Sequence, residues 1–249
     1  MLLLHGFTGS SRSWPTFLLN GLSQDRPVLA VDLPGHGATP APSPGEGGFS
    51  ATLDALVRLL DAEGISSADW IGYSMGGRIA LAGALTHPHR VRRLVLESAS
   101  PGLATPRGQE LRRSRDETLA RRIEEEGIAS FVDFWMGLSL FASQKRLPEP
   151  MRRATREARL RQDPDALALS LRALGTGSQP SYWPQLPHFG KPVLLLTGAL
   201  DRKFQELADR MAKALPAAHR HTVPEVGHAV HLEDPAAWVE AVVAFLDAP

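Results

Sequence analysis

The feature that most constrains how this chain can fold is the pentapeptide Gly-Tyr-Ser-Met-Gly at residues 72–76. It ends Ala68–Tyr73, a short apolar run typical of a buried strand, and opens Met75–Thr86, a segment with the pattern of a helix. Glycines on both sides of a serine allow the sharp turn that lifts its hydroxyl above the carboxyl end of a strand. Strand, turn and helix in this order predict a parallel sheet with Ser74 as a candidate nucleophile.

The rest of the chain alternates short apolar runs with helical patterns, which indicates a mostly parallel, doubly wound α/β sheet. The other predicted strands are Leu2–Leu4, residues 27–33, Val91–Glu97, Val193–Gly198 and residues 219–223. Further helices are predicted at residues 49–63, where apolar residues repeat on one face, and at residues 235–246, which begin with proline.

Residues 102–187 break this alternation, because they are helical in pattern, rich in Arg and Glu, and contain no convincing strand. We therefore expect one domain with an insertion: a first part of the core at residues 1–101, a helical lid at 102–187 and a second part of the core at 188–249. Residues 107–161 of the lid hold twelve arginines and one lysine against nine acidic residues. The Pro/Gly-rich residues 40–48 are predicted to form a loop.

Composition excludes several classes of protein. The 249 residues include no cysteine, which rules out disulfides, cysteine nucleophiles and thiolate metal sites. Zero net charge offers no long-range field for nucleic acid, and no run approaches the roughly 20 apolar residues of a membrane span. There is no Walker loop, no G-x-G-x-x-G and no metal-binding histidine spacing, so we expect no metal and no nucleotide cofactor. A cytoplasmic protein is expected, and its oligomeric state is not indicated.

A serine hydroxyl needs a base to become reactive, and two other strand ends supply candidate partners. His228 follows the last predicted strand, and Asp201 follows Val193–Gly198. Their order along the chain, which is serine, then acid, then histidine, is the order typical of this kind of strand–turn–helix site. Ser74, Asp201 and His228 are therefore the predicted catalytic residues.

Backbone N–H groups close to the serine are candidates for stabilising a negatively charged oxygen. Met75 begins the helix after the serine, and Phe7 follows the first strand in a His-Gly-hydrophobic turn. Phe7 and Met75 are thus the predicted oxyanion donors. His36 and His231 are each expected to have a structural role instead.

Several segments of the chain resemble one branch of the α/β-hydrolase superfamily, the 2-succinyl-6-hydroxy-2,4-cyclohexadiene-1-carboxylate synthases of the menaquinone pathway. In the core they are residues 31–37 (VDLPGHG), 72–78 (GYSMGGR), 198–204 (GALDRKF) and 226–235 (VGHAVHLEDP). In the lid they are residues 98–103 (SASPGL), 112–117 (RRSRDE), 131–135 (FVDFW) and 174–180 (LGTGSQP). The likeness covers nearly the whole chain, and the arginine after the double glycine and the arginine-bearing lid are its most diagnostic parts.

Members of this family eliminate pyruvate from a cyclohexene that carries succinyl, carboxylate and enolpyruvyl groups. The resemblance implies that Ser74, kept deprotonated by His228 and Asp201, removes a ring proton without forming an acyl-enzyme. It also implies a small polycarboxylate substrate. The substrate-binding residues that it implies are Arg78, Arg112 and Arg159 for the carboxylates, and Tyr73, Trp135 and Lys203 for further contacts.

Physical chemistry agrees with this resemblance. A substrate with three carboxylates needs several fixed cations, and guanidinium groups bind carboxylates through paired hydrogen bonds. Arg78 lies one turn after Ser74 on the same helix face, where a pocket for an apolar acyl group would have little use for it. Two alternatives remain open: a serine hydrolase of ester, thioester or C–C bonds on the same triad, and a non-catalytic binder.

The N-terminus departs from the resemblance. Family members carry a longer segment before the His-Gly turn, and that segment forms antiparallel edge strands. This sequence begins with Met1, directly before the first predicted strand. The N-terminal edge strands are therefore expected to be missing from this sequence, either because it is shortened, because its true start lies upstream, or because the protein lacks this edge.

Overall fold

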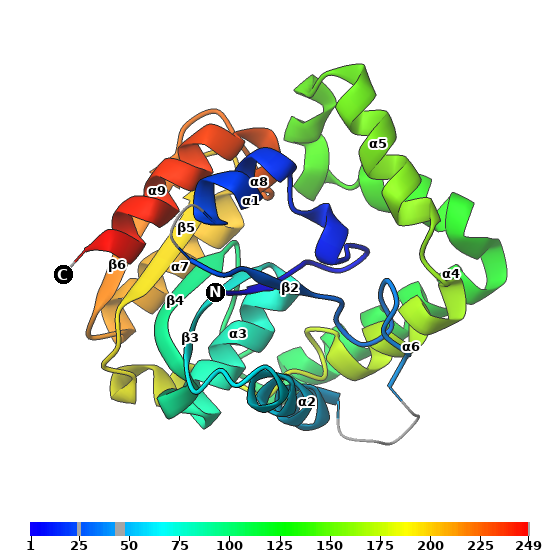
Figure 1. Ribbon diagram of the computed structural model, residues 1–249. Coiled ribbons are helices and arrows are strands. Elements are labelled where there is room, and N and C mark those ends of the chain that lie inside the picture. Colours follow the sequence, from blue (N-terminus) through cyan, green and yellow to red (C-terminus); the bar gives the residue numbers. More distant parts are fainter. Residues whose placement is uncertain (24–25, 43–47, 249) are drawn as a thin grey trace.

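The computed structural model describes residues 1–23, 26–42 and 48–248, and these contain a six-stranded sheet. The strands, all parallel to their neighbours, are β1 (Leu2–Leu4), β2 (Leu29–Val31), β3 (Ala68–Tyr73), β4 (Val91–Glu97), β5 (Val193–Gly198) and β6 (Ala218–Val223). Their spatial order is β2-β1-β3-β4-β5-β6 (Figure 1). The winding direction reverses between β1 and β3, and such a reversal is where open α/β sheets bind ligands, beyond the carboxyl ends of the strands.

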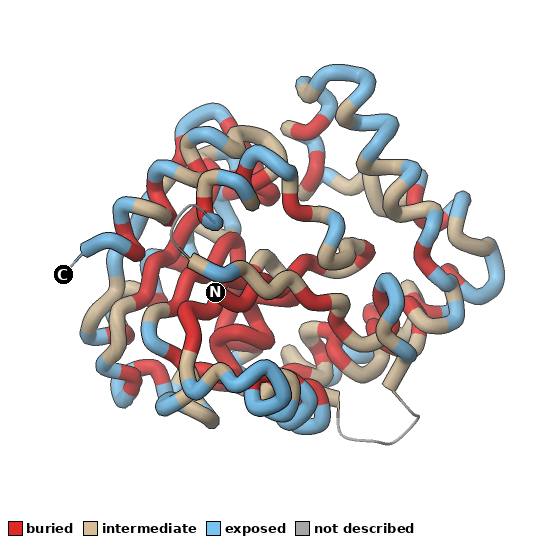
Figure 2. The backbone as a smooth tube through the Cα atoms, viewed as in Figure 1, coloured by how far each residue is buried: buried red, intermediate tan, exposed pale blue. Residues whose placement is uncertain are grey.

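Helices cover both faces of this sheet. On one face are α2 (Gly48–Ala62), α3 (Met75–Thr86) and α7 (Arg202–Ala214), and on the other are α1 (Thr16–Ser23) and α9 (Pro235–Asp247). Along β1, Leu2 and Leu4 pack in the hydrophobic cluster under α2, α3 and α7, and Leu3 packs in the cluster under α1 and α9. All three side chains are fully buried. Figure 2 shows the resulting buried strands inside a partly exposed helical layer.

The predicted doubly wound α/β sheet is confirmed, with small differences at its boundaries. β2 covers only Leu29–Val31 of the run predicted at residues 27–33, and Gly48 begins α2 instead of ending a loop. Residues 43–47 of that predicted loop lie outside the described residues. Three further helices outside the lid, α1, α7 and α8 (Val230–Glu233), were not predicted. The buried residues of α7 are Ala208 and Met211, which make an apolar stripe too narrow to stand out in the sequence.

Every described element between β4 and β5 is helical. These elements are α4 (Pro106–Gly137), η3 (Ser139–Arg146), α5 (Glu149–Leu160), α6 (Pro164–Leu174) and η4 (Trp183–His188). The helix α4 changes direction at Gly127, whose φ of 76° is outside the helical range. The division of the chain at residues 101 and 187 stays a prediction. Within the described residues, no helix is long and apolar enough to cross a membrane.

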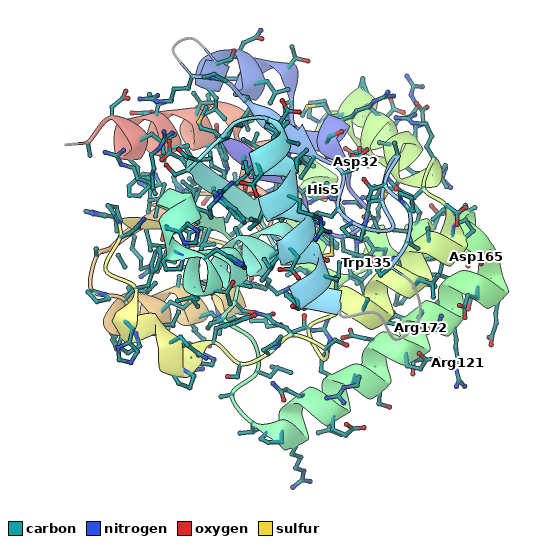
Figure 3. The ribbon with its side chains drawn as sticks, turned by 60° about the horizontal axis from the view of Figure 1, so that its bottom comes forward. His5, Asp32, Arg121, Trp135, Asp165 and Arg172 are labelled. Carbon is teal, nitrogen blue, oxygen red and sulfur yellow. The ribbon has the colours of Figure 1, made fainter. Side chains whose placement is uncertain are left out.

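Ion pairs within the lid connect two of its helices. Arg172 of α6 donates hydrogen bonds to Glu117 and Glu124 of α4, at 2.8 Å and 2.9 Å. These bonds, with one from Arg121, hold the pKa of Glu117 at about 2. Figure 3 shows Arg121 and Arg172 on the outer side of the lid. Because the pairs are exposed to solvent, each contributes little to stability, and they orient the two helices more than they strengthen them.

Candidate active site

Ser74 lies in a strained turn between β3 and α3. Its φ of 50° and ψ of −105° are unfavourable for a residue with a side chain, and its N–H donates to the carbonyl of Glu97 on β4 at 2.8 Å. The turn needs glycine at both flanks. A Cβ at Gly72 would come within 2.4 Å of the Gly76 carbonyl oxygen, and one at Gly76 within 2.1 Å of the Leu4 carbonyl oxygen. Local sequence thus determines that the hydroxyl projects from the sheet.

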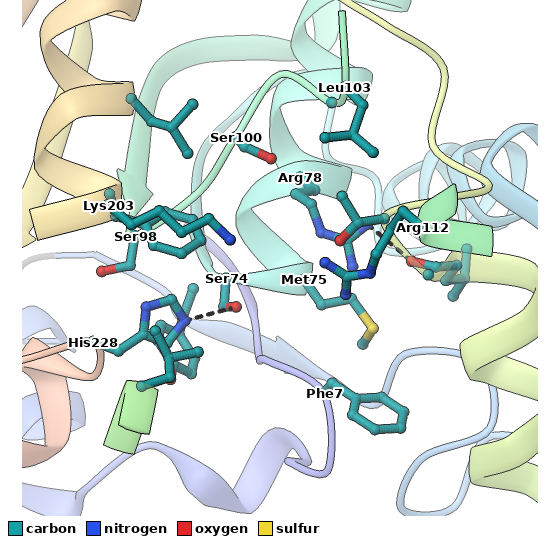
Figure 4. Close-up of a pocket in the computed structure, with 18 of the residues that line it drawn as sticks. Phe7, Ser74, Met75, Arg78, Ser98, Ser100, Leu103, Arg112, Lys203 and His228 are labelled. Atoms are coloured by element: carbon teal, nitrogen blue, oxygen red, sulfur yellow. Dashed lines mark hydrogen bonds between the residues drawn. The ribbon is translucent and has the colours of Figure 1, made fainter. Parts of the chain in front are cut away.

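The structure places His228 between Ser74 and Asp201. Its Nδ1 lies 2.6 Å from Asp201 Oδ2, and its Nε2 lies 3.0 Å from Ser74 Oγ (Figure 4). Because a carboxylate only accepts hydrogen bonds, Nδ1 carries the proton, and the lone pair of Nε2 accepts the serine hydroxyl. This is the arrangement in which Ser-His-Asp triads activate a serine.

Two further contacts orient the histidine. Asp201 is the N-cap of α7, and its Oδ1 accepts the Phe204 N–H at 3.3 Å, so its carboxylate is held from two sides. The Phe204 ring packs against the His228 ring at 4.6 Å. Downstream, Glu233 in α8 (Val230–Glu233) accepts the Gly227 N–H at 2.8 Å, which closes the loop that carries His228.

The loop that holds Phe7 is braced by two buried histidines. His5 Nε2 accepts the Leu33 N–H at 3.0 Å, and His36 Nε2 accepts the Thr8 N–H at 3.2 Å. Both rings must be neutral at the accepting nitrogen. Burial lowers the pKa of His5 to about 4 and that of His36, which also faces His5, to about 3. The structural role expected for His36 therefore agrees with its contacts.

We expect acid to destabilise the fold through these two rings. An unfolded histidine has a pKa near 6.5, so below about pH 6.5 the unfolded state binds protons that the folded state excludes. Stability is therefore lost as the pH falls from about 6.5 toward 4 and 3. At pH 5 each ring should lower the free energy of unfolding by about 2 kcal/mol. Urea unfolding at pH 7 and pH 5 measures this loss. The His36→Gln variant should lose less unfolding free energy between pH 7 and pH 5 than the wild-type protein does. An equal loss in the two proteins would contradict the role given to the His36 ring.

Phe7, Ser74 and Met75 line one cavity of about 360 Å³. Met75 is the first residue of α3, and the first N–H groups of a helix have no partner within it. Phe7 follows β1, the strand next to β3 in the sheet. The two predicted oxyanion donors therefore come from neighbouring strand ends, at the reversal point of the winding.

The six residues expected to contact substrate also line this cavity: Arg78, Arg112, Arg159, Tyr73, Trp135 and Lys203. Arg78 is buried, and its Nη1 donates to the Leu174 carbonyl at 2.9 Å and to Gln179 Oε1 at 3.3 Å. Burial, and repulsion from Arg112, lower its pKa to about 9. A buried guanidinium whose partners among the described residues are neutral is favourably placed to take an anion.

The other cations differ in how they are held. Arg112 donates to Asp116 Oδ1 at 2.7 Å, and the second oxygen of Asp116 accepts the Gly177 N–H at 2.9 Å. Arg159 lies over the Phe141 ring at 5.4 Å, and burial lowers its pKa. Burial also lowers the pKa of Lys203, with repulsion from Arg112 as the next cause. Figure 4 shows Lys203 on one side of Ser74, with Arg78 and Arg112 on the other.

Sequence reasoning missed three residues that shape this site. Gln179 orients Arg78, and Arg210 of α7 lines the cavity with its guanidinium 4.4 Å from the Trp183 ring. Glu97 is fully buried and accepts the ring N–H groups of His231 and Trp238, each at 2.8 Å. The sequence held one signal for Glu97, namely an acidic residue at the end of the apolar run Val91–Glu97. A carboxylate buried at a strand end needs hydrogen-bond donors close to it.

The chain matches the α/β-hydrolase fold family over residues 1–235. A putative 2-succinyl-6-hydroxy-2,4-cyclohexadiene-1-carboxylate synthase from Bacillus subtilis is 42% identical over 248 residues, which cover 99% of this chain and 89% of that protein. The chain belongs to this synthase family. The synthase of Pectobacterium atrosepticum is 33% identical and is matched over 94% of its length by 100% of this chain.

A solved structure supports the same assignment. MenH from S. aureus superposes on 98% of this chain with a TM-score of 0.94 and 35% identity, and 92% of its own chain is covered. The predicted fold and the predicted membership of the synthase family are both confirmed. The roles of individual side chains, and the expectation that this synthase-family chain uses no metal or nucleotide, stay predictions.

Proposed function

We propose that this chain eliminates pyruvate from 2-succinyl-5-enolpyruvyl-6-hydroxy-3-cyclohexene-1-carboxylate and releases 2-succinyl-6-hydroxy-2,4-cyclohexadiene-1-carboxylate. The observation that carries the proposal is the convergence of Arg78, Arg112 and Arg159 on the cavity that holds Ser74. The substrate has three carboxylates, and burying a carboxylate is costly unless a cation and hydrogen bonds replace its hydration. Relatives that are named as synthases of this product support the same reaction.

The reaction is a 1,4-elimination that the succinyl ketone makes possible. This ketone acidifies the neighbouring ring C–H, so that loss of the proton from ring carbon 2 gives an enolate. The enolate electrons shift the ring double bonds to the 2,4-diene, and the bond from ring carbon 5 to the enolpyruvyl oxygen breaks. The departing enolpyruvate takes up a proton and becomes pyruvate. The reaction consumes no water and needs no acyl-enzyme.

The triad supplies the base for the first step. Ser74 Oγ transfers its proton to His228, and Asp201 stabilises the charge on that ring. The serine oxygen then removes the ring proton, and the histidine can return a proton to the leaving group. The enolate oxygen is stabilised by the N–H groups of Phe7 and Met75, which act where negative charge develops.

A serine hydrolase is the second candidate, and the triad itself favours it. A serine activated by histidine, with two backbone donors nearby, is suited to acyl transfer. The cations that surround the serine argue against a neutral, apolar acyl group as the natural substrate. A non-catalytic binder is less well supported, because it would have no use for a serine within 3.0 Å of the histidine base.

The proposal includes the cytoplasmic location expected from the sequence. The substrate is a trianion, and a charged group enters a bilayer only at high cost. It must therefore be made and used on the same side of the membrane.

Pyruvate release tests the proposal. The enolpyruvyl-cyclohexene substrate is added to the protein, and free pyruvate is followed with lactate dehydrogenase and NADH. Labelling with a fluorophosphonate reports separately whether Ser74 is reactive. We expect both pyruvate release and labelling. Labelling without pyruvate release would support the hydrolase, and the absence of both would support the binder.

A further inference from the structure

A second cavity, of about 200 Å³, lies behind the wall of the substrate cavity. The two cavities share three lining residues, Phe7, Tyr73 and Arg159. The second one is bounded by the loop after β1, by η1 (Ser11–Ser13), by α5 of the lid and by α8. It is smaller than the roughly 300–1,000 Å³ usual for drug-sized ligands, so it suits a fragment of the substrate better than the whole ring.

The lining of this second cavity is positively charged. It includes Arg12 and Arg159 and no aspartate or glutamate among the residues the structure describes. The hydroxyl-bearing residues Thr8, Ser13 and Thr155 also line it. Two guanidinium groups without an acid, beside side chains that donate hydrogen bonds, favour a small carboxylate as ligand.

The wall between the two cavities is formed by the shared residues Phe7, Tyr73 and Arg159, and Tyr73 is closely packed within it. The centroids of the Tyr73 and His231 rings are 4.5 Å apart, and a Cβ at Gly6 would come within 2.6 Å of the Tyr73 ring. His231 is itself held by Glu97 through its ring, at 2.8 Å, and through its backbone N–H, at 3.1 Å. The phenol ring therefore cannot swing aside without disturbing a buried carboxylate.

Arg159 is the charged residue of the shared wall. It is half-buried on α5, and its Nη1 is buried without a hydrogen-bond partner among the described residues. Leaving a buried donor unsatisfied costs stability, and an anion on either side of the wall could recover that cost. Arg159 lines both cavities, so one cationic side chain is shared between them.

We propose that the second cavity is a binding site for a small monocarboxylate, and that it takes the 2-oxo acid as it leaves the substrate cavity past Arg159. This inference rests on the proposed function, which supplies pyruvate as the leaving carboxylate. Arg12, which lines only the second cavity, holds the released anion away from the ring product.

Equilibrium binding of pyruvate alone tests this site without any turnover. The wild-type chain is titrated with sodium pyruvate at constant ionic strength and observed by NMR. Arg12→Gln removes a cation of the second cavity, and Ala158→Phe fills part of it from α5. Arg78→Ala changes only the substrate cavity, and Arg58→Gln, at an exposed position of α2 outside both cavities, is the matched control.

We expect Arg12→Gln and Ala158→Phe to weaken pyruvate binding at least fivefold, Arg78→Ala to weaken it less than Arg12→Gln does, and Arg58→Gln to bind as wild type does. Methyl pyruvate, which is neutral, should not compete. Thermal melting identifies a variant that fails to fold, and Arg12, being exposed, is the safer substitution. Binding that is lost in Arg78→Ala and kept in Arg12→Gln would overturn the proposal, as would no saturable binding of pyruvate. Pyruvate release during turnover tests the function separately, so the two failures are distinguishable.

Discussion

Replacing Ser74 with alanine is expected to lower kcat for pyruvate release by roughly 10⁴-fold or more, because the triad acts as one unit. In the proposed mechanism the serine oxygen takes the ring proton, and His228 lies 3.0 Å from that oxygen, with Asp201 on the other side of its ring. Alanine adopts the same strained φ of 50° as readily as serine does, so the turn between β3 and α3 should keep its shape. Initial rates of pyruvate formation, with thermal melting as the folding control, measure the effect.

A double variant tests whether Ser74 and His228 contribute to the rate as one unit or independently. If Ser74 and His228 act together, Ser74→Ala combined with His228→Ala should be about as slow as either single variant. Fluorophosphonate labelling should disappear in both proteins that lack the serine. A Ser74→Ala protein that keeps a tenth of the wild-type rate would show that another group removes the proton, and the roles assigned to the triad would then be wrong.

Replacing Arg78 with alanine is expected to cost roughly 2–5 kcal/mol of transition-state binding for the tricarboxylate substrate, because a buried carboxylate would lose its cation. Lysine at this position should recover only part of the loss, since it lacks the planar pair of donors. A neutral ester that is hydrolysed at Ser74 should be nearly indifferent to the change. The values of kcat/KM for both substrates measure this difference.

The structure adds a control for the Arg78 result. Because Arg78 also donates to the Leu174 carbonyl and to Gln179, its loss could loosen residues 174–179 as well as remove a charge. Gln179→Leu removes one of these bonds and keeps the guanidinium, so it should lower kcat/KM far less than Arg78→Ala does. Equal losses in the two variants, or an equal loss for the neutral ester, would indicate a purely structural role for Arg78.

The triad could be predicted because each member is set by local sequence. Ser74 needs only its flanking glycines and a strand before it, and Asp201 and His228 each follow a strand. Parallel strands bring their carboxyl ends to one side of the sheet, so positions far apart in the sequence had to meet there. The fold and the three catalytic candidates followed from the same pattern.

The surroundings of the triad could not be predicted in the same way. The Arg78 side chain bonds to Leu174 and Gln179, about a hundred residues later, and no local pattern encodes that packing. The sequence indicates a positively charged lid, but not that Arg172 is neutralised by Glu117 while Arg159 faces two cavities. Which cations face inward depends on the relative orientation of the lid helices, and tertiary packing determines that orientation.

Rapid-quench mass spectrometry of the wild-type protein during turnover is the most direct measurement of how Ser74 acts. The protein is mixed with the enolpyruvyl-cyclohexene substrate and quenched at intervals. Its intact mass is recorded beside the amounts of pyruvate and of the ring diene. If Ser74 is a base, the protein stays unmodified at every time, and pyruvate and diene appear in equal amounts. An acyl adduct on Ser74, or turnover of the ring without pyruvate, would contradict the elimination.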